Sequence, residues 1–246
     1  MKEEWYKEDL AYIHDVGFSD YALKSAPGIL EILDRNKIRE GLVVDLGCGS
    51  GLSARELVKA NYRVFGVDIS ESMIDLARKR VPNAEFRVGS LFEIEIPTCN
   101  AVISIGECIN YLFDPNNDSQ MLINLFDRIY KSLTPGGVFI FDIVEAGQIE
   151  TGTKDRGFIQ EKDWVVLVEK EEDLEQNILT RRIITFRKVG EYYRRDEEIH
   201  RQQLYKGADI VKVLLQVGFQ NVETMHNYGE YKLPIARAAF IARKPA

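Results

Sequence analysis

The sequence predicts an α/β protein built around a mainly parallel sheet with helices on both faces. Along the first 150 residues, short continuous apolar runs alternate with segments whose apolar residues recur at helical spacing, a pattern typical of such a sheet. A glycine-rich turn at residues 47–51 joins the first run to the helical segment after it. The chain has 246 residues, 45% of them hydrophobic and 29% charged, so it is long enough for one such domain with a modest insertion.

The first part of the chain predicts a helical lid followed by the core of the domain. Pro27 suits the first turn of a helix that carries Ile29 and Leu33. Residues 1–40 are expected to be a helical N-terminal lid on the domain. Ser70 lies where an N-cap belongs, directly before another helical segment. The apolar runs that predict the five strands of the core are residues 43–46, 64–68, 85–88, 101–105 and 138–141.

After residue 150 the pattern changes to strands without helices between them. Residues 151–205 are therefore expected to form a small antiparallel sheet inserted after the fifth strand. Residues 206–246 return to the earlier pattern, with a helix that ends at Gly218. The strands expected in the insertion are residues 164–168, 180–186 and 192–200, and the last two strands are residues 222–225 and 238–242.

Charge and cysteine usage argue against several classes of protein. The formal net charge of −7 disfavours a nucleic-acid binder, which needs clustered lysine and arginine. The three cysteines show no metal-binding spacing and the three histidines are scattered, so no metal site is expected. No apolar run approaches the ~20 residues that cross a bilayer, and no secretion signal opens the chain. Three unpaired thiols without a secretion signal predict a protein of the reducing cytoplasm. The lack of a long apolar run predicts that the protein has no membrane segment.

The turn that leaves the first strand is the most informative segment. Gly47 and Gly49 allow the backbone to turn tightly and to approach a ligand, and open α/β sheets bind ligands beyond the carboxyl ends of their strands. Asp68 ends the second strand, where an acid can accept hydrogen bonds from ribose hydroxyls. The NAD fingerprint would need glycine in place of Leu52. Asp45 is awkward beside a pyrophosphate but suits the ammonium end of S-adenosylmethionine.

Three segments carry a resemblance to a known family. Residues 43–51 resemble motif I of the class I S-adenosylmethionine-dependent methyltransferases, residues 65–70 resemble their second motif, and residues 133–141 resemble their L-x-P-G-G strand entry. The likeness extends from about Tyr12 to the C-terminus. It implies a single Rossmann-like domain of seven strands with the last antiparallel, and residues 41–150 as its cofactor-binding core. It also implies S-adenosyl-L-methionine as cofactor and S-adenosyl-L-homocysteine as product.

The inserted strands extend the resemblance to a subgroup. The pattern Arg195-x-x-Glu198-x-His200, followed by Gln-Leu-Tyr at residues 203–205, is similar to small-molecule methyltransferases that include amine and sugar N-methyltransferases. The resemblance therefore implies methyl transfer to a nitrogen or oxygen atom of a small-molecule acceptor.

The resemblance also implies which residues hold the cofactor. By position in the family pattern, these are Asp45, Gly47, Cys48 and Gly49 for the methionine part, Asp68 for the ribose, Ile69 and Met73 against the adenine, Ser90 and Leu91 along the adenine edge, Gly106 and Glu107 beside the sulfonium, and Tyr21 over the cofactor carboxylate. Many relatives have aspartate where Ser90 stands, which leaves a side-chain contact to the adenine amino group open.

Methyl transfer from a sulfonium is an in-line displacement, for which positioning of the two reactants is the main requirement. An amine acceptor needs only to be bound uncharged, whereas a hydroxyl benefits from a general base. His200 shares strand parity with Glu198 and is a candidate base, and His14 in the lid is a second. Glu107 and Tyr111 follow the fourth strand, where the acceptor is expected, and Glu107 is a candidate ligand for a cationic amine.

Other interpretations stay open at this point. An RNA or protein methyltransferase is one, although residues 105–108 lack the Asn/Asp-Pro-Pro-aromatic signature of many base-amino methyltransferases. A non-catalytic S-adenosylmethionine-binding protein is another, and an NAD-dependent dehydrogenase is the weakest. A homodimer is also left open.

Overall fold

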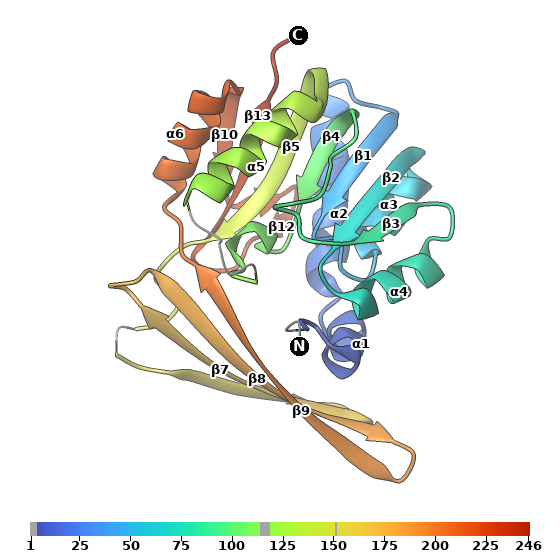
Figure 1. Cartoon of the computed structure of the whole chain (residues 1–246), viewed down its shortest axis with the longest axis vertical. Coiled ribbons are helices and arrows are strands. Elements are labelled where there is room, and N and C mark those ends of the chain that lie inside the picture. The colour runs from blue at the N-terminus through green and yellow to red at the C-terminus, as the bar shows by residue number, and fades with distance from the viewer. Residues whose placement is uncertain (1–3, 114–118, 151) are drawn as a thin grey trace.

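A seven-stranded sheet forms the centre of the protein in a computed structural model, which describes residues 4–113, 119–150 and 152–246. Its strands are β1 (Gly41–Leu46), β2 (Tyr62–Asp68), β3 (Glu85–Val88), β4 (Cys99–Ser104), β5 (Leu133–Val144), β10 (Gln220–Met225) and β13 (Arg237–Arg243). Their order is β10-β13-β5-β4-β1-β2-β3 (Figure 1). The strands β1 to β5 pair in parallel, whereas β13 runs antiparallel to both β5 and β10. The predicted mostly parallel sheet with an antiparallel last strand is confirmed.

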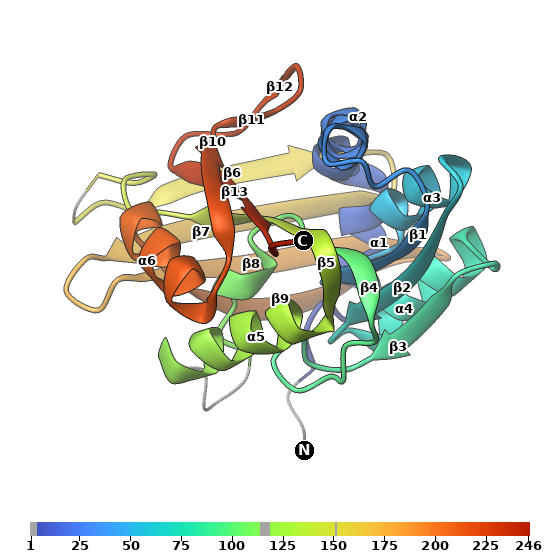
Figure 2. The same cartoon turned by 90° about the horizontal axis from the view of Figure 1, so that it is seen from above.

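Helices cover both faces of the sheet, as Figure 2 shows. They are α2 (Asp20–Arg35), α3 (Leu52–Lys59), α4 (Glu71–Arg80), α5 (Ser119–Ser132) and α6 (Gly207–Val217). One buried cluster joins Phe126 of α5 and Leu214 of α6 to the sheet. A second joins Ile29 of α2, Leu57 of α3 and Ile74 of α4 to the opposite face. The core is therefore two apolar layers with the sheet between them.

The N-terminal segment forms two helices, α1 (Glu8–Gly17) and α2, and Pro27 lies inside α2. The prediction that Pro27 lies in the first turn of a helix is therefore wrong. A proline in a helix interior removes one backbone hydrogen bond. However, α2 buries Ala26, Ile29 and Leu33, and we attribute the continuity of the helix through the proline to this packing.

The insertion is an antiparallel sheet of four strands, not the three expected, in the order β6-β7-β8-β9. All the residues of β6 are exposed. Its sequence does not alternate between apolar and polar residues, which is the pattern from which a half-buried strand is predicted. The sheet lies across the carboxyl ends of the parallel strands (Figure 1), and α1 contacts both β8 and α4. The strands are β6 (Asp155–Gln160), β7 (Trp164–Asp173), β8 (Ile178–Val189) and β9 (Tyr192–Gln203).

The remaining elements are short. A 3-10 turn, η1 (Cys108–Asn110), follows β4, and a small hairpin of β11 (Asn227–Tyr228) and β12 (Tyr231–Lys232) follows β10. Ser70 caps α4 as predicted, because its side-chain oxygen accepts a hydrogen bond from the backbone N–H of Met73. Within the described residues, no helix has the length and apolar character needed to cross a bilayer.

Candidate active site

A cavity of about 610 Å³ lies between the carboxyl ends of the parallel strands and the inserted sheet. Its walls come from the glycine-rich turn after β1, the end of β2, the segment after β4, helices α1 and α2, and strands β7 and β8. All the residues that the sequence assigns to the cofactor line this one cavity: Tyr21, Asp45, Gly47, Cys48, Gly49, Asp68, Ile69, Met73, Ser90, Leu91, Gly106 and Glu107. The fold thus brings together residues that are up to 86 positions apart (21 to 107).

The glycine-rich turn has a backbone that only glycine adopts readily. Gly47 and Gly49 have φ angles of 80° and 51°, in the left-handed region. The N–H groups of Gly47 and Cys48 donate to the carbonyl of Val67, at 2.8 and 2.9 Å, which ties the turn to β2. A Cβ on Gly47 would collide with the sulfur of Cys108, whereas a Cβ on Gly49 would meet no atom within 4 Å. Gly49 therefore presents open backbone to the cavity.

Two carboxylates flank this turn. Asp68 accepts hydrogen bonds from the N–H groups of Gly49 and Ser70, both at 2.9 Å, which fixes its orientation at the end of β2. Asp45 is 2% exposed, and among the described residues one of its oxygens has no hydrogen-bond partner. Burial, with a smaller contribution from Asp68, raises the pKa of Asp45 to about 7. A cationic ligand group beside Asp45 would offset the cost of burying this carboxylate.

The segment before and within α1 closes the cavity from the side of the inserted sheet. The N–H groups of Tyr6 and Lys7 donate to the carboxylate of Glu198 on β9, at 2.8 and 2.9 Å. The hydroxyl of Ser70 donates to the carbonyl of Tyr6 at 2.8 Å. The hydroxyl groups of Tyr6 and Tyr111 are 2.8 Å apart. These bonds join the N-terminal segment to both the core and the insertion, and Tyr6, Leu10 and His14 of this segment line the cavity.

A buried carboxylate at the end of β5 organises the segment after β4. Asp142 accepts hydrogen bonds from the N–H groups of Gly106 and Glu107 and from the hydroxyl groups of Tyr21 and Tyr228. The Tyr21 and Tyr228 bonds measure 3.0 and 3.1 Å. Tyr21 therefore lies on the cavity wall, and its hydroxyl group is held by Asp142. Burial raises the pKa of the Tyr21 hydroxyl group. Its predicted contact with the cofactor carboxylate stays a prediction.

Glu107 is held by two arginines. Its two oxygens accept from Arg181 of β8 at 3.0 and 3.1 Å, and one also accepts from Arg237 of β13 at 2.7 Å. The side chains of the three residues are 5%, 12% and 15% exposed, respectively. A carboxylate already paired with two guanidinium groups is a poor ligand for a cationic amine, so Glu107 is less suited to the amine-binding role expected from the sequence.

The candidate bases occupy different environments. His14 lines the cavity, and burial lowers its pKa to about 4, so its imidazole is neutral at neutral pH. Tyr111 also lines the cavity. His200 is fully buried, and its Nε2 lies 2.8 Å from Glu198. It packs against Tyr6, with ring centroids 4.8 Å apart, and is not part of the cavity wall. This position favours His14 over His200 as a group that reaches a ligand.

Comparison with known proteins connects this geometry to an activity. A family model of the methyltransferase domain matches residues 43–137, the stretch that holds the glycine-rich turn, Asp68 and Glu107. The chain is an S-adenosylmethionine-dependent methyltransferase with the class I fold. A protein of Bacillus subtilis (strain 168) named as methyltransferase YqeM is 26% identical over 187 residues, 74% of each chain. An 18S rRNA (guanine-N(7))-methyltransferase of Bos taurus is 30% identical over 134 residues, 51% of this chain and 47% of the relative.

Solved structures agree with this fold over almost the whole chain. An S-adenosylmethionine-dependent methyltransferase from Clostridium acetobutylicum is 22% identical with a TM-score of 0.81, and the match covers 96% of this chain and 98% of that one. CalS10, an S-adenosylmethionine-bound amino pentose methyltransferase from Micromonospora echinaspora, is 15% identical with a TM-score of 0.73. That match covers 99% and 100% of the two chains, so it includes the inserted sheet.

The methyltransferase cavity also contains residues that the sequence did not single out. Asp142, Lys170, Arg181 and Arg237 all lie at or beside the cavity wall. Asp142 could have been recognised as a candidate site residue from the sequence, because it is a lone acid within the apolar run of β5. Lys170 and Arg181 lie in stretches with other charged residues, where nothing in the sequence distinguishes them from solvated side chains. Arg237 begins the apolar run of β13, but no local pattern in the sequence indicates that it reaches Glu107.

Proposed function

We propose that this methyltransferase binds S-adenosylmethionine against the glycine-rich turn and methylates a nitrogen or oxygen atom of a small molecule held beneath the inserted sheet. The observation that carries the proposal is the shared cavity, whose walls are the turn on one side and Val166, Val168 and Ile183 of the insertion on the other. A cavity that holds both reactants can align them, and alignment of two bound reactants contributes roughly 7–11 kcal/mol to lowering a barrier.

The residues of the turn fit such a cofactor. The unpartnered oxygen of Asp45 suits an ammonium group, and the open backbone at Gly49 leaves room for the methionine part. Asp68 has both oxygens oriented by backbone N–H groups and retains acceptor capacity for ribose hydroxyls. Ile69 and Met73 supply apolar surface for the adenine. When bound, the cofactor would supply an electrophilic methyl group on a sulfonium.

The chain's own residues would orient the acceptor and manage one proton. Methylation of a neutral amine or a hydroxyl releases a proton from the accepting atom. Neutral His14 can accept a hydrogen bond from that atom, although its lowered pKa makes it a weak base. Tyr6 and Tyr111 offer hydroxyl groups in the same wall. An amine acceptor, which needs only to be bound uncharged, therefore suits this cavity better than a hydroxyl.

A small acceptor is favoured over RNA by the charge of the protein. The net charge is −7, and two cations beside α1, Arg187 and Arg194, are already paired with Asp9. The match to the rRNA methyltransferase covers only 51% of this chain, so it does not indicate which substrate this chain takes. An RNA substrate would require binding that weakens steeply with salt, which a titration at two ionic strengths measures. The three free thiols support a reducing compartment such as the cytoplasm.

Isothermal calorimetry with S-adenosylhomocysteine tests the proposal. The wild type should bind it, and Asp68→Ala should weaken binding by at least about 1 kcal/mol, the scale of losing hydrogen bonds to a charged group. Asp75→Ala, which removes an exposed carboxylate from α4, is the matched control and should bind as the wild type does. Absence of binding to the wild type, or equal affinities for the Asp68 variant and the wild type, would contradict the assignment.

A further inference from the structure

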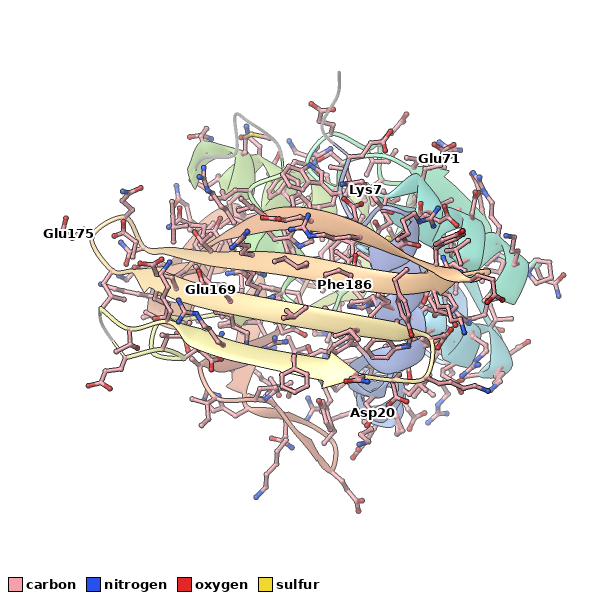
Figure 3. The ribbon with its side chains drawn as sticks, turned by 90° about the horizontal axis from the view of Figure 1, so that it is seen from below. Lys7, Asp20, Glu71, Glu169, Glu175 and Phe186 are labelled. Carbon is pink, nitrogen blue, oxygen red and sulfur yellow. The ribbon has the colours of Figure 1, made fainter. Side chains whose placement is uncertain are left out.

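Two cations stand opposite each other on the face of the inserted sheet that lines the cavity. Lys170 of β7 and Arg181 of β8 are directly paired in the antiparallel register, and both line the cavity. Figure 3 views the sheet from its other face, to which Glu169 and Phe186 belong by strand alternation. Like charges directly opposite each other destabilise a sheet. The pair therefore carries an electrostatic cost that a bound anion would relieve.

The charges around this pair do not neutralise it fully. Glu107 is shared between Arg181 and Arg237, so these three side chains together carry one positive charge. Among the described residues, Lys170 forms an ion pair only with Asp155 of the edge strand β6, at 3.4 Å, and that carboxylate is 58% exposed. An exposed pair at this distance contributes little. Lys170 therefore retains most of its capacity to bind another anion.

Glu172 is a further acid on this face, one pleat further along β7. Asp196 and Glu198 of β9 also belong to this face; they bind the side chain of Lys7 and the backbone N–H groups of Tyr6 and Lys7. The two oxygens of Glu172 accept from the backbone N–H groups of Gly147 and Gln148, both at 2.9 Å. These bonds orient the carboxylate toward the loop after β5. They also hold the backbone of Gln148 against β7, two residues along the strand from Lys170, and Gln148 and Lys170 both line the cavity.

Two cavity-lining residues carry buried donors for which the described part of the chain supplies no acceptor. Among the described residues, Nε of Arg181 and Nε2 of Gln148 have no hydrogen-bond partner. A buried donor left unpaired is costly, so native structures usually pair such groups with protein, water or ligand atoms. Two unpaired N–H donors and an ammonium group on one wall need acceptor oxygens, and charged ones bind most strongly there.

We propose that the methyl acceptor carries an anionic oxygen group, a carboxylate or a phosphate, which Lys170, Arg181 and Gln148 bind. This inference rests on the proposed function, because it assigns the end of the acceptor that does not react. The anion would lie at the inserted-sheet end of the cavity, and the atom to be methylated would lie toward the glycine-rich turn. Arg181 then has two roles, since its two Nη groups hold Glu107 while its unpaired Nε is left to bind the acceptor.

Calorimetric titration of the protein saturated with S-adenosylhomocysteine tests this site with two probes, sodium acetate and sodium phosphate, at constant ionic strength. Saturating the cofactor region first confines the probes to the rest of the cavity. The wild type should bind one of the two anions saturably, and the anion that binds more tightly identifies a carboxylate or a phosphate. Lys170→Met and Gln148→Leu, which keep the side-chain size, should each weaken binding about tenfold or more.

Lys188→Met is the matched control, because it removes an exposed lysine from the outer face of β8 and should leave anion binding unchanged. Unchanged S-adenosylhomocysteine affinity in each variant shows that it folds. If neither anion binds saturably, or if the Lys170 variant binds as tightly as the wild type, the anion site is refuted while the proposed function stands. If S-adenosylhomocysteine itself does not bind, the proposed function is the part that fails.

Discussion

Replacing Glu107 with glutamine should destabilise the protein strongly. The change keeps the shape of the side chain but leaves Arg181 and Arg237 without a counter-charge in a place where their side chains are only 12% and 15% exposed. Removing one partner of a buried ion pair costs about 3–5 kcal/mol. Because both guanidinium groups keep some contact with the cavity, we expect the lower end, about 3 kcal/mol.

The ion pairs of Glu107 with Arg181 and Arg237 also predict how this loss of stability depends on pH. Burial by itself would raise the pKa of Glu107, but Arg181 and Arg237 outweigh it and lower the pKa below its ordinary value. A group whose pKa is lower in the folded state contributes its stability in full above its unfolded pKa, about 4.3. That contribution is lost as the pH falls through the folded pKa. The difference between the wild type and Glu107→Gln should therefore be constant at neutral pH and shrink in acid.

Urea unfolding followed by circular dichroism at a series of pH values measures both effects. Glu175→Gln, at the exposed turn between β7 and β8 (Figure 3), is the control and should change stability by less than about 0.5 kcal/mol. A loss of under about 1 kcal/mol for Glu107→Gln at neutral pH would mean that the buried pair is not formed in solution. A difference that does not depend on pH would refute the lowered pKa of Glu107.

Three further perturbations follow from single residues. Burial holds the pKa of His14 at about 4, below its unfolded value, so stability falls as the unfolded chain gains a proton in acid. Urea unfolding should show the wild type losing about 1–2 kcal/mol between about pH 7 and about pH 5 that His14→Gln does not lose; equal losses would count against this pKa. Gly49→Ala should cost about 1–2 kcal/mol from its left-handed backbone and weaken S-adenosylhomocysteine binding, because the new methyl group enters the cavity; unaltered calorimetric affinity would show that the ligand lies elsewhere. Ser70→Ala should lower the unfolding free energy by about 1 kcal/mol through loss of the cap and speed hydrogen exchange in the segment around Tyr6; unchanged exchange there would argue against the lid contact.

The half of the site assigned to the cofactor could be predicted because its residues follow consecutive strands. Parallel strands present their carboxyl ends at one edge of the sheet, so Asp45, Gly49 and Asp68 had to meet once the alternation of strands and helices was recognised. The cap at Ser70 was predictable for the same local reason. Their roles toward the cofactor stay predictions until a ligand is bound.

The half of the site that faces the acceptor depends on long-range register. Lys170 and Arg181 oppose each other because β7 and β8 pair in one register, and a shift by one residue would turn the side chains of one strand to the other face. Arg237 reaches Glu107 through the antiparallel last strand. The sequence contains no local signal for either arrangement. The strand β6 could not be predicted, because all its residues are exposed and its sequence shows no alternation of apolar and polar residues.

The cofactor assignment can be checked by a crystal structure of the complex with S-adenosylhomocysteine. We expect density for the ligand in the cavity, with its ribose hydroxyls on Asp68 and its ammonium group beside Asp45, and with free volume left under Lys170 and Arg181. Density for the ligand at any other place, or a filled cavity with no room beside these two cations, would contradict this expectation.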